Sequence, residues 1–213
     1  MNYSVRKKNK IVKYIVIHYT GMKNLKLAYK KLSCENSNVS SHYLISRKGI
    51  IFNLLCSKYK AWHAGKSKWR DDININDYSI GIELENKGHD FGYSNFSIKQ
   101  YYSLRKLIFF LKKNFRIIDK DIVFHSDIAP NRKQDPGEKF LINKIGIKRF
   151  NNKKMKNKYS LDEMLNLYGF HNTYIRNYKL FCIKAVKRTL NYHDINSSQS
   201  KKFLNDFYNL LFC

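Results

Sequence analysis

Residues 121–137 read Asp-Ile-Val-Phe-His-Ser-Asp-Ile-Ala-Pro-Asn-Arg-Lys-Gln-Asp-Pro-Gly and join a short apolar strand to an irregular loop. Both prolines of the 213-residue chain, Pro130 and Pro136, lie in this loop, whereas average usage predicts about ten along the chain. Because proline fixes φ, two prolines so close together indicate a loop of fixed shape. His125 ends the strand and Asp135 follows ten residues later, so one rigid segment carries an imidazole and a carboxylate.

Other strands and a long helix precede this segment. Apolar runs predict strands at residues 12–18, 41–46, 50–55 and 78–84, of which the second and third form a hairpin. Gly81, inside the last of these runs, indicates that another group approaches the backbone closely. Ser97 and Gln100 fit a capping box for a helix, because apolar residues recur at helical spacing after them. Strands separated by helices predict an α/β domain over residues 10–148.

The last part of the chain has a purely helical pattern. Residues 149–158 are polar and basic, which is typical of a linker. Three short helices are predicted after it, at residues 161–168 with Ser160 and Glu163 as a capping box, at residues 178–190, and after Ser198. Since about 50 residues in short helices bury little surface alone, we expect residues 159–213 to form a small bundle docked on the first domain.

The chain is strongly basic, with 41 Lys and Arg against 16 Asp and Glu and a formal net charge of +25. Such a balance usually indicates an anionic partner. However, the excess is +18 over residues 1–150 and +7 over residues 151–213, so neither part is a basic arm or tail. Lys, Asn, Ile, Tyr and Phe are abundant and have AT-rich codons, so genome composition accounts for most of the excess. We expect no dedicated nucleic-acid partner, because such proteins cluster their charge.

No sequence feature directs the chain to a membrane. No stretch approaches the roughly 20 uncharged apolar residues of a spanning helix. The apolar run after the basic N-terminus has four residues, and neither a cleavage site nor a lipobox is visible. We expect a cytoplasmic protein by default, with the cell envelope or periplasm as the alternative. No sequence pattern indicates an oligomeric state.

The cysteines do not form a recognisable framework. Cys34, Cys56, Cys182 and Cys213 are far apart, and no C-x-x-C pair is present. We expect free thiols, with the first three in the core.

A metal site is the chemistry that the histidines favour. His18 ends the first predicted strand as His125 ends a later one. Together with Asp135, these two side chains match a three-ligand zinc site with an open fourth position, which is the catalytic type of site. Spacing alone is weak evidence, because the chain has seven histidines and a single histidine is more often a structural hydrogen-bonding group.

Five segments occur in a fixed order along the chain: Ile-Val-Ile-His18-Tyr-Thr, Ser-His42-Tyr-Leu-Ile, Ala-Trp62-His63-Ala-Gly, Ser-Ile-Gly-Ile-Glu83-Leu-Glu-Asn and His125-Ser-Asp-Ile-Ala-Pro-Asn-Arg-Lys133-Gln-Asp135-Pro-Gly. This series resembles the zinc-dependent N-acetylmuramoyl-L-alanine amidases of the AmpD/AmiD type, relatives of the phage lysozyme-type amidases and the peptidoglycan recognition proteins. The resemblance covers roughly residues 12–142. It implies a mixed central β-sheet flanked by helices, a catalytic domain at residues 1–148, and a helical tail similar to a small peptidoglycan-binding domain.

The resemblance also implies roles for individual residues. It makes three residues the Zn²⁺ ligands: His18, His125 and Asp135. It makes Glu83 and Lys133 the catalytic pair, with Glu83 moving a proton between water and the leaving amine and Lys133 stabilising the oxyanion. Glu85 shares a face with Glu83 by the period of two and is the rival for the proton transfer.

Several further residues are expected near the substrate: His42, Trp62, His63, Asn86 and Arg132. For His42 and His63, a structural role is the alternative to substrate contact. The predicted activity is hydrolysis of the amide bond between N-acetylmuramic acid and L-alanine in peptidoglycan or muropeptides, in cell wall degradation or muropeptide recycling. The alternative is a module of the same fold that binds peptidoglycan without hydrolysing it.

Overall fold

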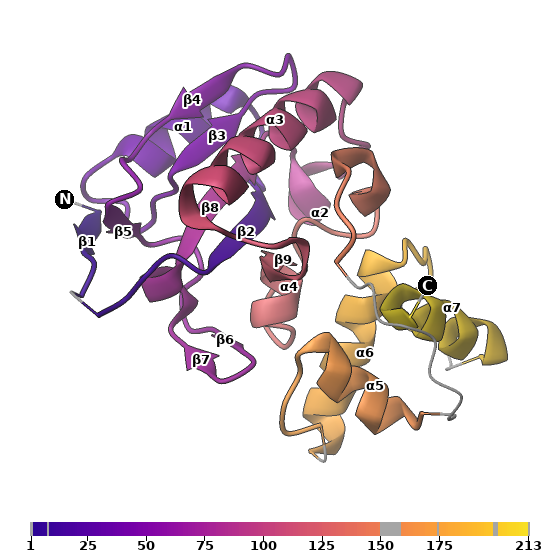
Figure 1. The fold of residues 1–213 in the computed structure, drawn as a ribbon. Coiled ribbons are helices and arrows are strands. Elements are labelled where there is room, and N and C mark those ends of the chain that lie inside the picture. Colours follow the sequence, from indigo (N-terminus) through magenta and orange to yellow (C-terminus); the bar gives the residue numbers. More distant parts are fainter. Residues whose placement is uncertain (1, 8, 150–158, 174, 198–199, 213) are drawn as a thin grey trace.

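The computed structural model describes residues 2–7, 9–149, 159–173, 175–197 and 200–212, and its centre is a five-stranded sheet (Figure 1). The strand order is β4 (Ile51–Asn53), β3 (Tyr43–Ile45), β8 (Ser79–Leu84), β2 (Tyr14–Tyr19) and β9 (Ile122–Phe124). β4 pairs with β3 in antiparallel fashion, and the other neighbours are parallel. The predicted α/β architecture with a mixed sheet is confirmed.

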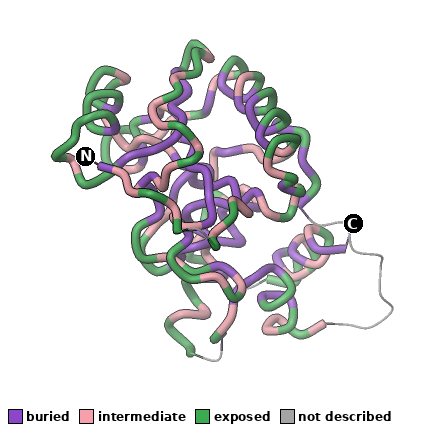
Figure 2. Tube along the Cα trace, turned by 60° about the vertical axis from the view of Figure 1, so that its left-hand side comes forward, coloured by how far each residue is buried: buried purple, intermediate pink, exposed green. Residues whose placement is uncertain are grey.

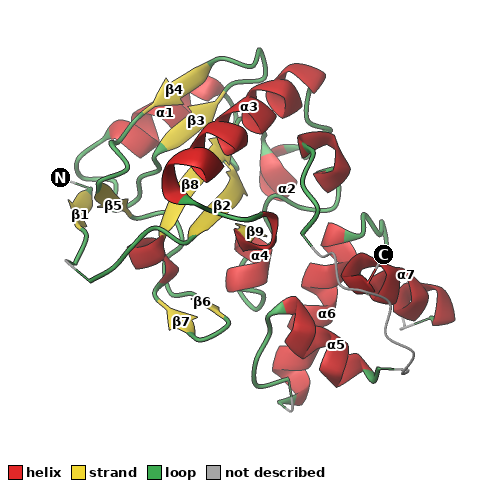
Figure 3. Ribbon diagram, viewed as in Figure 1, coloured by secondary structure: helices red, strands yellow, loops and turns green. Residues whose placement is uncertain are grey.

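Helices and short strands surround this sheet (Figure 3). The helices are α1 (Leu25–Ser33), α2 (Gly88–Phe91), α3 (Ile98–Phe115), α4 (His125–Ile128), α5 (Leu161–Tyr168), α6 (Arg176–Thr189) and α7 (Lys201–Phe212), with 3-10 turns η1 (Ile75–Tyr78), η2 (Asp119–Asp121) and η3 (Ile142–Ile145). Two small antiparallel pairs lie beside the sheet: β1 (Tyr3–Val5) with β5 (Tyr59–Ala61), and β6 (Lys68–Trp69) with β7 (Asp72–Ile73).

The two faces of the sheet bury different partners. Along β2, Ile15 and Ile17 belong to the apolar cluster that the inner side of α3 completes. Tyr14 and Val16 point the other way, into the cluster that contains the core residues of α5, α6 and α7. Because side chains alternate along a strand, His18 lies on the same face as Tyr14 and Val16. The strand therefore directs its histidine away from α3.

α3 begins and ends as its sequence indicates. The Ser97 hydroxyl accepts a hydrogen bond from the Gln100 N–H and the Gln100 side chain accepts one from the Ser97 N–H, which confirms the predicted capping box. The helix runs past the predicted apolar repeat to Phe115, and its C-cap residue Arg116 has a left-handed φ of 55°. Buried residues on its inner side cover one face of the sheet (Figure 2).

The C-terminal helices pack against one another and against the opposite edge of the fold from β4 (Figure 1). The Ser160–Glu163 capping box predicted for α5 is present. In α6, Ile183 and Val186 are buried as predicted, but Leu180 is 48% exposed, so that part of the predicted apolar side is wrong.

A buried cluster of Arg149, Asp127 and Tyr168 joins α5 to the sheet domain. The Arg149 guanidinium donates to the Asp127 carboxylate at 2.7 Å, and both side chains are fully buried. The Tyr168 hydroxyl at the end of α5 donates to the same carboxylate at 2.9 Å. Arg149 is the first residue of the predicted linker, and its side chain is buried in the core. The rest of the predicted linker, residues 150–158, lies outside the described residues.

Arg149→Met is expected to destabilise the protein by about 3–5 kcal/mol, because it leaves the Asp127 carboxylate buried without its counter-charge. Urea unfolding followed by circular dichroism measures the change. The matched control is Arg70→Met, since Arg70 pairs with Asp121 at 2.8 Å in a partly exposed position and such a pair contributes about 1 kcal/mol or less. Equal losses in the two variants would contradict this account of the buried pair.

Two cysteines and one short helix differ from the sequence predictions. Cys182 is buried, as predicted, but Cys34 and Cys56 are exposed, so their assignment to the core is wrong. Cys34 caps the end of α1, a helix that was not predicted and that buries only Ala28 and Leu32. A sparse apolar stripe gives little periodic pattern to detect.

Candidate metal centre and its cleft

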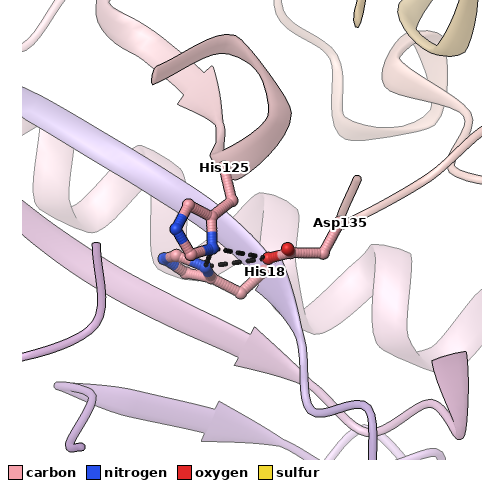
Figure 4. A group of neighbouring side chains, drawn as sticks. All are labelled: His18, His125 and Asp135. Carbon is pink, nitrogen blue, oxygen red and sulfur yellow. Dashed lines mark hydrogen bonds and ion pairs between the residues drawn. The ribbon is translucent and has the colours of Figure 1, made fainter. Parts of the chain in front are cut away.

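Three side chains from different parts of the chain converge at one end of the sheet (Figure 4). His18 lies near the end of β2, His125 is the first residue of α4, and Asp135 follows in the loop. The two Nδ1 atoms are 2.9 Å apart, and the Asp135 Oδ2 atom is 3.0 Å from each of them. All three residues are buried. The structure thus brings together the three ligands predicted from the sequence.

The outer nitrogen of each imidazole has a partner that orients the ring. The His125 Nε2 atom lies 3.2 Å from the Ala64 carbonyl oxygen, which accepts a hydrogen bond from it. The His18 Nε2 atom lies 2.9 Å from the Nδ1 atom of His63, and the His63 Nε2 atom lies 3.1 Å from the Ser79 hydroxyl. When each outer Nε2 carries the proton, both inner Nδ1 lone pairs are available to a cation. Metal-binding histidines are oriented by outer partners in this way.

The electrostatics of the cluster favour a bound cation. Burial, together with the neighbouring His125, lowers the pKa of His18 to about 4. Burial alone raises the pKa of Asp135, but its charge interactions and hydrogen bonds with the two histidines hold it well below the usual value. The Asp135 carboxylate therefore places a negative charge beside two converging imidazole nitrogens.

The donor set fits a divalent metal ion with one open position. Tetrahedral zinc with bonds of about 2.0–2.1 Å places its ligand atoms roughly 3.3 Å apart. The observed separations of 2.9–3.0 Å are slightly shorter, so only a small expansion is needed to seat an ion. Three protein ligands leave the fourth position of such an ion free for water or substrate.

Glu83 lies on the same side of the sheet, one strand away. It pairs with His18 in the parallel register of β2 and β8. Its Oε2 atom is buried and has no hydrogen-bond partner among the described residues. Burial raises the pKa of Glu83 well above its usual value, and the Asp135 charge adds to this effect while Lys133 opposes it. A carboxyl group with a raised pKa in a cleft is suited to holding and releasing a proton.

Glu85, the rival candidate, is in a different position. Its Oε2 atom accepts a hydrogen bond from the Arg47 backbone N–H at 2.7 Å. It lines a separate, smaller depression with Arg47, whereas Glu83 and Lys133 line the same cleft as the three converging residues. The geometry therefore favours Glu83 over Glu85.

The cleft has a volume of about 660 Å³ and contains some of the predicted substrate contacts. Trp62, His63 and Arg132 line it. Arg132 also donates two 2.7 Å hydrogen bonds to the Ala64 and Lys66 carbonyls, so it fixes the neighbouring loop.

His42 and Asn86 do not line this cleft, and their predicted contact with substrate does not fit their positions. His42 is fully buried, where its Nδ1 atom accepts from the Gly81 N–H at 3.0 Å. Asn86 is 1% exposed, and its amide donates to the Ser94 carbonyl at 2.7 Å. Both side chains form hydrogen bonds to the backbone of neighbouring segments and so help to hold those segments together.

Gly81 accounts for the position of His63. A Cβ atom at residue 81 would lie 2.5 Å from the His63 Cγ atom, a distance that real Cβ atoms do not adopt. The close approach predicted at this glycine is thus an imidazole ring, the one that contacts His18.

Gly81→Ala is expected to destabilise the protein by about 1–3 kcal/mol and to weaken metal binding, because the new methyl group displaces the His63 ring. Thermal unfolding and chelator competition measure the two effects. In a His63→Ala background the same substitution is expected to cost far less, since the clashing ring is gone. An identical cost in both backgrounds would show that the clash is not the cause.

Residues that sequence reasoning missed also line the cleft. α6 contributes Phe181, Lys184 and Arg188, and α1 contributes Lys31 and Leu32. Lysine is the commonest charged residue in this chain, and none of these positions lies in a recognisable motif, so no local pattern distinguishes them. Only the packing of α6 beside α4 brings its side chains to the site.

Comparison with known proteins agrees with this arrangement. A family model described as N-acetylmuramoyl-L-alanine amidase (Amidase_2) matches residues 7–138. The N-acetylmuramoyl-L-alanine amidase AmiD of Escherichia coli is 37% identical over 141 residues, which cover 61% of this chain and 50% of AmiD. The 1,6-anhydro-N-acetylmuramyl-L-alanine amidase AmpD of Haemophilus influenzae is 43% identical over 103 residues, 48% of this chain and 54% of that protein. The chain therefore spans about half the length of the curated relatives it matches.

Two solved structures are similar over almost the whole chain. AmpDh3 from Pseudomonas aeruginosa, in complex with anhydromuramic pentapeptide, has a TM-score of 0.80 and 26% identity, covering 98% of this chain and 95% of that one. AmiD from E. coli, in complex with the substrate anhydro-N-acetylmuramic acid-L-Ala-D-gamma-Glu-L-Lys, has a TM-score of 0.76 and 26% identity, covering 96% and 91%. In the described part of this chain, no helix has the length and apolar character needed to cross a bilayer.

Proposed function

The chain belongs to the N-acetylmuramoyl-L-alanine amidase family Amidase_2, and from this membership we propose that it hydrolyses the amide bond between N-acetylmuramic acid and L-alanine. The observation that carries the proposal is the presence of two groups in one cleft. One is the converging His18, His125 and Asp135 side chains. The other is the Glu83 carboxyl group, whose buried Oε2 atom has no hydrogen-bond partner in the described part of the chain.

We propose Zn²⁺ as the ion at the three-residue site. Imidazole nitrogen and carboxylate oxygen are ligands that zinc accepts, and three protein ligands are typical of its catalytic sites. When bound, zinc supplies Lewis-acid activation of water and of a carbonyl group. The hydrogen bonds of the His18 Nε2 atom with His63 and of the His125 Nε2 atom with Ala64 orient the two imidazoles toward the proposed ion.

Glu83 is the proposed proton carrier. Its raised pKa allows it to accept a proton from the attacking water and then to give that proton to the leaving amine of L-alanine. Lys133 lines the same cleft and lies two residues from Asp135, so its ammonium group is suited to stabilising the negative charge that develops on the carbonyl oxygen.

The proposed substrates are muropeptides, in which a stem peptide is attached to either anhydro or ordinary muramic acid. The ligand in the AmiD complex carries a γ-linked D-glutamate after L-alanine, and we propose the same peptide start for the substrate of this chain. Trp62 offers an aromatic face in the cleft for sugar or peptide contact. Residues 159–213 are proposed to assist in binding the wall polymer, and muropeptide recycling or wall degradation is the proposed role.

Mass analysis of products tests the proposal. Purified protein with zinc is incubated with defined anhydro and ordinary muropeptides, and release of the free stem peptide is the expected result. Peptide release from one substrate only would define the preference for the sugar. Binding of both substrates without any cleavage would overturn the proposal in favour of a non-hydrolytic peptidoglycan-binding module.

A further inference from the structure

Two basic residues of α6 extend the cleft beyond the candidate metal centre. Lys184 and Arg188 are four residues apart on one helix, so they lie on the same side of it, and both line the cleft. Arg188 is only 8% exposed, although it carries a full charge. Its Nε atom is buried and has no hydrogen-bond partner among the described residues.

The carboxylates near Arg188 are committed to other partners. Glu138 and Asp135 both interact electrostatically with the Arg188 guanidinium. However, no ion pair within 4.0 Å joins Arg188 to either of them in the described part of the chain. Glu138 pairs with His89 at 3.2 Å, and Asp135 contacts the two histidines of the metal centre. A buried guanidinium without a direct partner is costly, so an anionic group of a ligand is expected to satisfy it.

The end of α6 is held firmly against the rest of the site. Thr189, next to Arg188, lies 2.9 Å from the Tyr168 hydroxyl. Just past the helix, the Asn191 amide donates to the Glu138 carbonyl at 2.6 Å and to the Phe140 carbonyl at 2.8 Å. These contacts fix Arg188 relative to the loop that carries Asp135. A charged donor that is fixed in advance loses little entropy when it binds.

We propose that Arg188, assisted by Lys184, is the subsite for a carboxylate of the stem peptide. This inference rests on the proposed function. A γ-linked glutamate after L-alanine keeps its α-carboxylate free, and about two residues of peptide place that group roughly 7 Å beyond the cleaved amide. Arg188 lines the same cleft as Asp135 of the candidate metal centre, so both groups face one bound ligand. The planar guanidinium forms paired hydrogen bonds with a carboxylate.

Two substrates that differ by one group test the proposal: N-acetylmuramoyl-L-Ala-D-γ-Glu-L-Lys, and its analogue in which the free α-carboxylate of the glutamate is a carboxamide. The unmodified protein is expected to favour the carboxylate by about 10- to 100-fold in kcat/KM. In Arg188→Met the carboxylate substrate is expected to fall to the level of the amide, while the amide substrate changes little. Arg176→Met is the matched control, because Arg176 is an exposed base of the same helix outside the cleft.

Each outcome decides the matter. The subsite is overturned if Arg188→Met lowers kcat/KM equally for both substrates. It is also overturned if the unmodified protein does not prefer the carboxylate substrate. If Arg188→Met does not fold, Lys184→Met decides, and an unchanged preference in that variant overturns the proposal. If the unmodified protein cleaves neither substrate, the proposed function fails. Calorimetric binding of the two peptides then tests the subsite separately, because a carboxylate preference that Arg188→Met abolishes still supports it.

Discussion

Glu83→Gln is expected to slow the hydrolysis of a muropeptide by about 10²–10⁴-fold, which is the usual contribution of a positioned general acid and base. Glutamine has nearly the same shape as glutamate but neither accepts nor donates a proton in the required way. The Glu83 Oε2 atom has no protein hydrogen bond to lose among the described residues, so the fold is expected to remain intact. Steady-state kinetics, zinc content and thermal unfolding of the variant measure the three consequences.

Glu85→Gln is the matched control for this result. Residue 85 is two positions along the same segment, and its side chain needs only to accept a hydrogen bond from the Arg47 N–H, which glutamine also does. Its activity is expected to stay within a few-fold of the unmodified protein. A larger loss in Glu85→Gln than in Glu83→Gln would reverse the assignment of the proton carrier.

Removal of the metal is expected to abolish hydrolysis completely, and zinc is expected to restore it. The same treatment is expected to lower the unfolding temperature. An ion that binds only the folded state at 1,000 times its Kd adds about 4 kcal/mol of stability, which corresponds to about 10 °C for a chain of this size. Calorimetry of chelated and reloaded protein measures this shift independently of any activity.

Asp135→Ala separates the metal centre from general effects of charge in the cleft. It removes one of the three proposed ligands, so zinc affinity is expected to fall by at least about 100-fold. Asp90→Ala is the control, because Asp90 also lines the cleft but is exposed and lies outside the three-residue group. Identical zinc affinity in the two variants would remove the basis for the proposed site.

The sequence was informative wherever a local pattern has a local cause. The strand that carries His18, the capping boxes of α3 and α5, and the rigid loop with its two prolines follow from short-range rules of burial, capping and backbone restriction. The family resemblance that those segments carry is also confirmed. Convergence of His18, His125 and Asp135 was expected from that resemblance rather than from spacing.

Features that depend on tertiary packing were beyond reach of the sequence. Arg149 lies in a polar, basic stretch, and only the fold reveals that its charge meets Asp127 in the core. Arg188 is one base among 41 and becomes distinctive through the packing of α6. His42 shares its motif context with residues of the cleft, yet its ring turns to the Gly81 backbone instead.

The buried Arg149–Asp127 pair limits how this protein can be trimmed or fused. The family match ends at residue 138, which makes a shortened fragment an obvious choice for an engineered lytic fusion. Such a fragment would discard the cation that neutralises Asp127, two residues from His125, together with the Tyr168 hydroxyl that shares this carboxylate. A shortened version of this protein therefore needs residues 159–213 for a stable core, even when these helices contribute nothing to binding the wall polymer.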